Sequence, residues 1–432
     1  MKGYLSPAVE VRKLARLIGV DAEDLACFER LEGQAIRDLR DQVTVVLFDA
    51  DRQLLARVAT ATKLIPAKLA AVIGERAFGP LLCARITGLL DPSRAVDIAN
   101  HLPVTFLADL SLHLDPRRAS RVIGAMPPAK VAGIAAELAA SEEYITMGGF
   151  VGHLSKAALL AALDAVDDES LLRTAYVIEA KQNIAALVAL LPDARLDDII
   201  ATASSADLWI EALDVLDHVT ERQRGTLGDL AAAQDDEVLD SMVRAALSHG
   251  LWSEVLPVVR AMSPESRKRF ATLKSIQARR VLATIIDAAA EDSLWAELLV
   301  LLPLLPTTAR RQVAALATSF DLDLFEQIVS TAHEEELWPA LIAFAAELDK
   351  GPRREIAKLI DESDADVLGS LLSAVHEAGL QADLVTVLRE LPAAGQRRLG
   401  TRIAAAPTEL VEALTEAADA AVLEPLSKAL KA

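Results

Sequence analysis

Basic side chains recur at a fixed interval in the second half of this 432-residue chain. Guanidinium groups bind carboxylates and phosphates through paired hydrogen bonds, so aligned arginines would suit an acidic peptide or an anionic ligand. A solvated face, or ion pairs with carboxylates of neighbouring helices, is the alternative interpretation. The first set, spaced by 43 residues, comprises Arg224, Arg267, Arg310 and Arg353, and beside it stand Lys268, Arg311, Arg354 and Arg397.

Other residue types give little sign of catalysis. His333 and His376 are also 43 residues apart, and they could form a weak metal or pH-sensing pair or two solvated helix ends. Stacked helices lie roughly 8–10 Å apart, which is too far for two imidazoles to share one ion. Cys27 and Cys83 stand among apolar residues and are expected to be buried free thiols. We therefore predict no catalytic residue, no metal and no cofactor, although an enzyme whose residues converge only in three dimensions remains a rival.

All four tryptophans follow a leucine and occupy one position of a 43-residue repeat. A period of this length is typical of helical repeat proteins. Because each Leu-Trp pair begins an apolar stretch, we expect the rings to pack between repeats, and an exposed ridge that binds a partner is the alternative. This aromatic column comprises Trp209, Trp252, Trp295 and Trp338.

Each 43-residue unit predicts three helices. The first begins at the tryptophan, and the second begins after a cap such as Ser263 followed by Pro264. The third has apolar residues at helical spacing, as in 282–289. Only 25 residues separate Ile184 from Trp209, so the middle helix of that unit is expected to be missing. The predicted fold is an all-α, right-handed α-solenoid of the armadillo or HEAT type.

Composition and charge agree with helices and narrow the partners. The chain is 52% hydrophobic but only 4% aromatic, which favours Ala- and Leu-rich helices over strands. Its net charge is −19, so we expect neither nucleic-acid binding nor adsorption to anionic membranes. No apolar stretch approaches the ~20 residues of a membrane span, and the first residues lack the apolar region of a signal peptide. A cytoplasmic protein without membrane insertion is expected.

Two helix starts upstream carry a family resemblance. The stretch 90–95, Leu-Asp-Pro-Ser-Arg-Ala, recurs at 114–119 as Leu-Asp-Pro-Arg-Arg-Ala, with Leu102-Pro103 between them. Residues 85–180 thereby resemble the cytosolic N-terminal superhelical domain of MgtE-type magnesium transporters, which is similar to the armadillo-like part of the flagellar motor-switch protein FliG. The transporter's membrane segments and CBS domains have no counterpart in this sequence. The resemblance implies a stack of short helices that acts as a contact surface, and it transfers no site residue.

These observations predict three parts: 1–84, an N-terminal helical cap or small helical domain; 85–183, the MgtE-like helical repeats; and 184–432, the tandem 43-residue repeats with a C-terminal cap. The expected function is that of a non-enzymatic scaffold that binds another protein, or an acidic segment of one, along its groove. The alternative is a binder or carrier of a hydrophobic small molecule or lipid inside the superhelix. The sequence does not indicate an oligomeric state.

Overall fold

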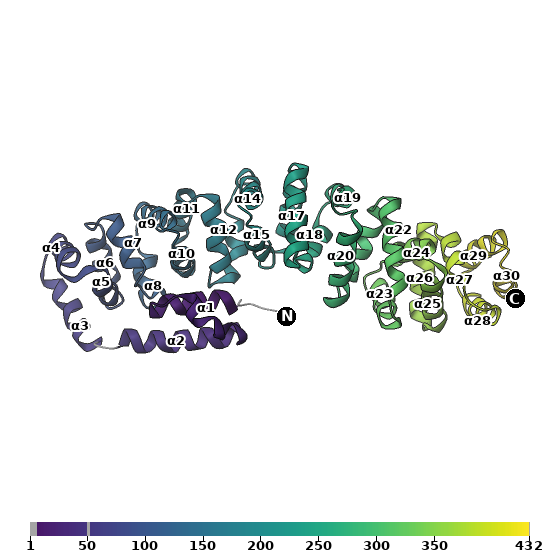
Figure 1. Ribbon diagram of the computed structural model, residues 1–432, viewed down its shortest axis with the longest axis horizontal. Coiled ribbons are helices and arrows are strands. Elements are labelled where there is room, and N and C mark those ends of the chain that lie inside the picture. Colours follow the sequence, from purple (N-terminus) through teal and green to yellow (C-terminus); the bar gives the residue numbers. More distant parts are fainter. Residues whose placement is uncertain (1–6, 50–51, 432) are drawn as a thin grey trace. The chain divides into compact units, whose positions relative to one another are not determined.

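The computed structural model describes residues 7–49 and 52–431, and within these ranges it contains 30 α-helices and no strand (Figure 1). The expected all-α class is therefore confirmed. The chain divides into two compact units. The first unit comprises Met1–Pro192 and Ser205–His218, and the second comprises Asp193–Ser204 and Val219–Ala432.

Some helices of the first unit, among them those that begin at Pro116 and Asp168, start after a capping side chain. The Asp115 carboxylate accepts a hydrogen bond from the amide of Arg117 at 3.0 Å, and Asp167 accepts one from the amide of Ser170 at 2.8 Å. These acceptors satisfy amides that have no partner inside the helix. The elements are α1 (Pro7–Ile18), η1 (Ala22–Arg30), α2 (Gly33–Asp49), α3 (Arg52–Ala61), η2 (Thr62–Leu64), α4 (Ala67–Ile73), η3 (Gly74–Phe78), α5 (Gly79–Thr87), α6 (Pro92–Ala99), α7 (Val104–Ser111), α8 (Pro116–Gly124), α9 (Pro128–Ala140), α10 (Tyr144–Phe150), η4 (Val151–His153), α11 (Lys156–Ala165), α12 (Asp168–Val177), η5 (Lys181–Asn183), α13 (Ile184–Val188) and α15 (Trp209–Leu216).

The first helices have a small apolar core of their own. Val11 and Leu14 of α1 pack against Ile36 of α2, which is completely buried. Leu25 and Phe28 of η1 close this cluster from the side. We call α1, η1 and α2 together the N-terminal hairpin. Its core is separate from the apolar clusters of α5–α12.

In the second compact unit, the first helix of three successive 43-residue repeats begins at the tryptophan, as expected. The apolar positions of the third helices are also buried: Leu282, Ile285, Ile286 and Ala289 are at most 5% exposed. Figure 1 shows α16 to α30 following one another in chain order. The elements are α14 (Asp193–Ser205), α16 (Glu221–Ala233), α17 (Asp236–His249), α18 (Trp252–Ala261), α19 (Pro264–Thr272), α20 (Arg279–Glu291), α21 (Trp295–Leu301), η6 (Leu302–Leu304), α22 (Thr307–Leu316), η7 (Ala317–Ser319), α23 (Leu322–Glu334), α24 (Trp338–Glu347), α25 (Lys350–Glu362), α26 (Ala365–Ala378), α27 (Gln381–Leu388), α28 (Ala393–Ile403), α29 (Thr408–Ala420) and α30 (Glu424–Leu430).

A residue in the left-handed conformation follows the third helix of each 43-residue repeat. It stands two residues before the first helix of the next repeat. The amide of the following residue then bonds back into the helix, as Leu294 does to the Ala289 oxygen at 2.9 Å. This geometry is the Schellman motif. From Asp207 the left-handed residues recur every 43 positions and extend the period to Val422. They are Asp207, Gly250, Ser293, Glu336, Gly379 and Val422, and Glu142 occupies the equivalent place before α10.

The shortened unit is present where the spacing predicted it. Only α13 and α14 lie between Ile184 and Trp209, so the middle helix is missing there. The expectation for one cysteine was wrong, because Cys27 is exposed. Leu25 and Phe28, three residues apart on η1, face the core of the N-terminal hairpin, and Cys27 between them faces away. Cys83 is half-buried, and burial raises the pKa of its thiol to about 11.

Candidate functional site

The tryptophan rings are core residues. Trp252, Trp295 and Trp338 of the second unit are at most 2% exposed, and Trp209 of the first unit is 4% exposed. In the second compact unit, each indole nitrogen donates to a side chain on the third helix of the same 43-residue repeat: Thr284 for Trp252, Gln327 for Trp295 and Ser370 for Trp338. The four rings are therefore buried, and no exposed aromatic ridge forms at these positions; packing between repeats stays a prediction.

The first set of periodic arginines comprises Arg224, Arg267, Arg310 and Arg353; we call it the inner set. Arg267, Arg310 and Arg353 donate to backbone oxygens that precede them by five to eight residues. Arg267 donates to the carbonyl oxygens of Val259 (3.1 Å), Arg260 (2.7 Å) and Met262 (2.9 Å) at the end of α18. These carbonyls have no amide partner within their own helix. Arg267 is therefore a helix C-cap supplied from the next helix.

Equivalent bonds to helix-end carbonyl oxygens recur in the following 43-residue repeats. Arg353 donates to Ala346 at 3.1 Å and Leu348 at 2.5 Å, with the same sequence offsets that join Arg267 to Arg260 and Met262. Arg310 donates to the Leu305 oxygen at 3.1 Å. Arg310 and Arg353 also form ion pairs with Glu347 and Glu390, at 3.0 and 3.3 Å.

One unit further, Gln396 stands where the inner set would continue. Its amide nitrogen donates to the oxygens of Arg389 at 3.3 Å and Leu391 at 2.8 Å, again with the same offsets. Because an uncharged amide does the same work, the position requires a hydrogen-bond donor to the helix end. Arg267, Arg310 and Arg353 therefore have a structural role; Arg224 on α16 is half-buried.

The basic residues that follow the inner set are exposed; we call Lys268, Arg311, Arg354 and Arg397 the outer set. Adjacent residues on a helix point about 100° apart, so one step along the chain separates a capping guanidinium from a solvated one. Across the part of the chain that the structure describes, the outer-set side chains form no hydrogen bond or ion pair. They are therefore available for an anionic partner.

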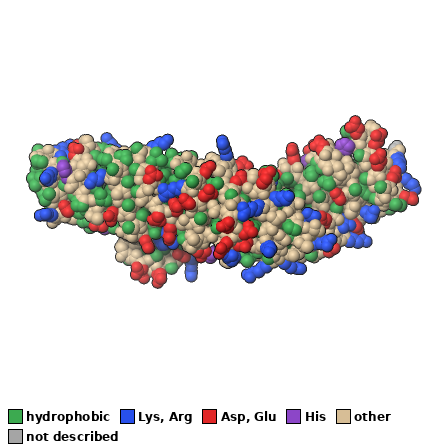
Figure 2. All heavy atoms as spheres, turned by 90° about the horizontal axis from the view of Figure 1, so that it is seen from above, with side chains coloured by type: hydrophobic (Ala, Val, Ile, Leu, Met, Phe, Trp, Pro, Cys, Tyr) green, Lys and Arg blue, Asp and Glu red, His purple; other side chains and the backbone are tan. Residues whose placement is uncertain are grey.

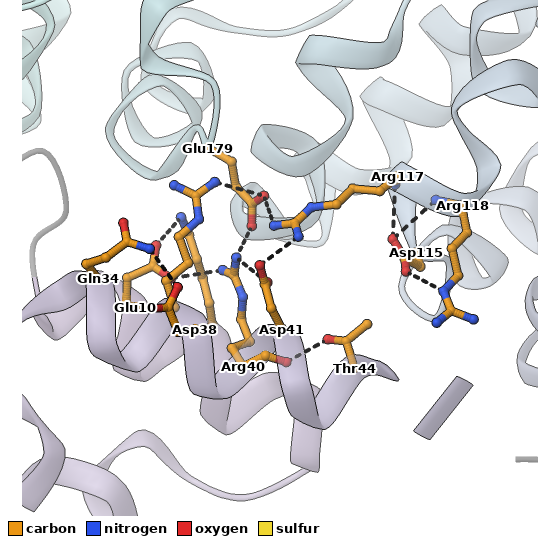
Figure 3. Close-up of polar contacts among 12 residues, drawn as sticks. Glu10, Gln34, Asp38, Arg40, Asp41, Thr44, Asp115, Arg117, Arg118 and Glu179 are labelled. Carbon is orange, nitrogen blue, oxygen red and sulfur yellow. Dashed lines mark hydrogen bonds and ion pairs between the residues drawn. The ribbon is translucent and has the colours of Figure 1, made fainter. Parts of the chain in front are cut away.

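A second concentration of charge joins the N-terminal hairpin to α8 and to the end of α12 (Figure 3). Glu10 is completely buried between Lys13 and Arg40, each 3.0 Å away. Arg40 also reaches Glu179 at 2.9 Å. Arg117 of α8 pairs with Asp41 at 2.7 Å and with Glu179 at 3.6 Å. We call these six residues the hairpin charge cluster.

The cations of the hairpin charge cluster keep two of its carboxylates, Glu179 and Asp41, ionised. Burial would raise the pKa of Glu179, but Arg40, Lys13 and Arg117 outweigh burial and hold that pKa below its ordinary range. Burial likewise opposes ionisation of Asp41, and Arg117 overcomes it, so the Asp41 pKa is also lowered. Carboxylates held in this way make poor proton acceptors. The arrangement fits the docking of a helical hairpin better than acid–base chemistry.

The histidine pair does not assemble a metal site. His333 Nε2 lies 3.8 Å from Asp366, and His376 Nδ1 lies 3.4 Å from the Gln381 amide. Within residues 7–49 and 52–431, no group of three or more His, Cys, Asp or Glu side chains could hold a metal ion. No helix in these ranges has the length and apolar character required to cross a lipid bilayer.

Comparison of the chain with models of protein families, with curated proteins and with solved structures finds no match in any of the three. The function is therefore inferred from the residues described above, foremost the outer set.

Proposed function

We propose that this protein is a non-enzymatic scaffold whose 43-residue units stack into a right-handed α-solenoid, and that it binds an acidic segment of another protein along the outer set. The observation that carries the proposal is the contrast between adjacent residues. The guanidinium groups of Arg267, Arg310 and Arg353 are already bonded, to carbonyl oxygens at helix ends or to glutamate carboxylates. Their neighbours in the outer set are exposed and have no partner in the described chain.

The spacing of stacked helices suits an extended peptide. Packed helices lie roughly 8–10 Å apart, and an extended chain advances about 3.3 Å per residue. An acidic residue at every third position would thus meet one member of the outer set after another. The contact of α25, which carries Arg354, with α28, which carries Arg397, supports such stacking for these two middle helices.

The surroundings of the outer set favour a negatively charged partner. The residues one turn further along these helices carry no acidic side chain: they are Thr272, Ala315, Lys358 and Thr401. Glu265, one turn before Lys268, is the nearest exception on α19. The basic outer set would attract acidic segments locally, while the acidic surfaces elsewhere on this chain of net charge −19 repel them.

A pair of synthetic peptides tests the proposal. One fluorescent peptide carries four glutamates at every third position, and the second has the same composition with the four glutamates adjacent. We expect the spaced peptide to bind more tightly in fluorescence anisotropy titrations. Replacing all four outer-set residues by glutamate should weaken its binding at least tenfold, because four attractions become repulsions.

A matched variant separates position from total charge. Arg244, Lys274, Arg279 and Arg280 are exposed and lie outside the outer set, so changing these four to glutamate gives the same net charge. This control should retain most of the affinity, and circular dichroism should show both variants folded. Equal binding by wild type and the outer-set variant would refute the proposal, and so would an equal loss in the two variants.

A further inference from the structure

The first unit contains a short basic segment that contrasts with the acidic chain. Residues 52–90 include six basic residues, and Glu75 is the one acidic residue among them. The chain as a whole has a net charge of −19. The six basic residues are Arg52, Arg57, Lys63, Lys68, Arg76 and Arg85.

The same segment exposes large apolar side chains. Leu64, in η2, has 86% of its surface exposed, and Leu69 on α4 has 48%. Lys63 and Lys68 stand before and after Leu64 in the sequence and are themselves exposed; Lys63 pairs with Asp91 at 2.6 Å, so Lys68 is the lysine that the proposal uses. Isolated exposed apolar residues are common on proteins, but a group of them marks an interaction surface. The exposed members are Leu54, Leu64, Leu69, Val72, Phe78 and Leu81.

These side chains share neighbouring surfaces. Lys68, Leu69, Val72 and Arg76 follow at helical spacing, so they lie along one face of α4 and η3. η3 contacts α5, which contacts α3, and α3 contacts η2. Figure 2 shows hydrophobic side chains gathered, with basic ones beside them, at the end of the molecule that carries α4.

The turn that presents Leu64 is held from within. The guanidinium of Arg94 on α6 donates to the carbonyl oxygens of Thr62 and Ile65, both at 2.5 Å. These two carbonyls stand on either side of Leu64 in the chain. The clamp from Arg94 therefore fixes the backbone of the turn while the Leu64 side chain projects into solvent.

We propose that Leu64 and Leu69, with Lys68 and Arg76, bind the surface of an anionic lipid bilayer. Leucines would enter the boundary between headgroups and acyl chains, and the basic groups would lie beside lipid phosphates. A projecting leucine between lysines needs no complementary pocket, which favours a bilayer over a folded protein partner. The proposal departs from the expectation, drawn from the net charge of −19, that the chain does not adsorb to anionic membranes. The acidic remainder of the chain opposes this local binding only weakly, because charges are screened beyond about 8–10 Å at physiological salt.

Vesicle co-sedimentation tests the proposal with the full chain. Vesicles of phosphatidylcholine with 30 mol% phosphatidylglycerol should bind the protein at least tenfold more strongly than vesicles of phosphatidylcholine alone. Replacing Leu64 and Leu69 by serine should weaken that binding about fivefold or more, and the pair Lys68→Glu and Arg76→Glu should abolish it. All four side chains are exposed, so the variants should keep the circular dichroism spectrum and melting temperature of the wild type.

Two control variants make the result specific. Leu322→Ser and Val422→Ser remove exposed apolar side chains elsewhere, at 48% and 79% exposure, and should leave vesicle binding unchanged. The glutamate variant of the outer set should also bind vesicles normally, since none of those residues belongs to the segment 52–90. No binding to anionic vesicles, or binding that persists in both segment variants, would overturn the proposal and favour a protein partner for this surface.

Discussion

The indole nitrogen of Trp338 donates a hydrogen bond of 3.1 Å to the hydroxyl of Ser370, 32 residues further along the chain. The same separation joins Trp252 to Thr284 and Trp295 to Gln327. Hydroxyl and amide oxygens both serve as the acceptor. The recurring feature is therefore that each buried indole N–H has a hydrogen-bond acceptor, whatever its residue type. Each tryptophan thereby joins the first helix of its unit to the third by packing and by one polar contact.

Replacing Trp338 should separate these two contributions. Trp338→Phe removes the hydrogen bond and part of the ring, and we expect it to cost about 1–2 kcal/mol of unfolding free energy. Trp338→Ala leaves a large cavity and should cost about 3–5 kcal/mol. Urea unfolding followed by circular dichroism measures both. A loss below ~1 kcal/mol for Trp338→Ala would contradict the core position of this ring.

Arg353 should matter for stability where its neighbour does not. Arg353→Leu leaves two helix-end carbonyls and Glu390 without their donor, and about 1–3 kcal/mol should be lost. Arg353→Gln should restore most of the stability, because Gln396 makes the equivalent bonds in the next unit. Arg354→Leu, the control on the exposed position, should change the unfolding free energy by less than about 0.5 kcal/mol. Similar losses for Arg353→Leu and Arg354→Leu would show that the inner and outer sets are not distinct.

The hairpin charge cluster should make docking of the N-terminal hairpin depend on pH. The pKa values of Glu179 and Asp41 are lower in the folded protein than in the unfolded chain. Their stabilising contribution is therefore present above the pKa of an unfolded carboxyl, at about pH 4, and is lost as the pH falls through the folded values.

Hydrogen exchange can follow this docking. We expect protection of residues 7–49 to fall on acidification below about pH 4, before protection of the third helices in the second unit. Added salt at pH 7 should screen the exposed ion pairs of the hairpin charge cluster and should therefore also lower the protection of residues 7–49. Loss of protection at the same pH throughout the chain would argue against a separately docked hairpin.

The two thiols should differ strongly in reactivity. Cys27 is exposed, whereas Cys83 is half-buried and burial raises its pKa to about 11. The thiolate is the reactive form, so iodoacetamide at pH 8 should modify Cys27 first and Cys83 far more slowly. Peptide mass spectrometry over time gives the two rates. Equal rates would contradict the half-buried position of Cys83.

Local patterns predicted most of what is local in this fold. The tryptophan period, the cap at Ser263 and the missing middle helix before Trp209 were all readable, because each depends on residues close in the chain. The left-handed turns were not, since Ser293 and Val422 are residue types that rarely adopt a positive φ. Among them, Gly250 and Gly379 carried the usual sequence signal.

The candidate site was predicted in position but not in detail. The period located both basic sets, yet it did not distinguish Arg267, which caps α18, from the exposed Lys268. That distinction needs the rotation of each helix against its neighbours. The hairpin charge cluster was missed because Glu10 and Glu179 are far apart in sequence. The hydrophobic-ligand carrier stays a prediction, which co-purifying lipid in a mass spectrum would support.

The most direct measurement of the central claim is the affinity for the spaced acidic peptide as the outer set is removed one residue at a time. Glutamine replaces Lys268, Arg311, Arg354 and Arg397 in turn, giving variants with one to four substitutions. If the four side chains form one row, each step should weaken binding by a similar factor, about two- to fivefold for an exposed ion pair. A single substitution that removes all binding, or a fourfold variant that binds as wild type does, would contradict the account.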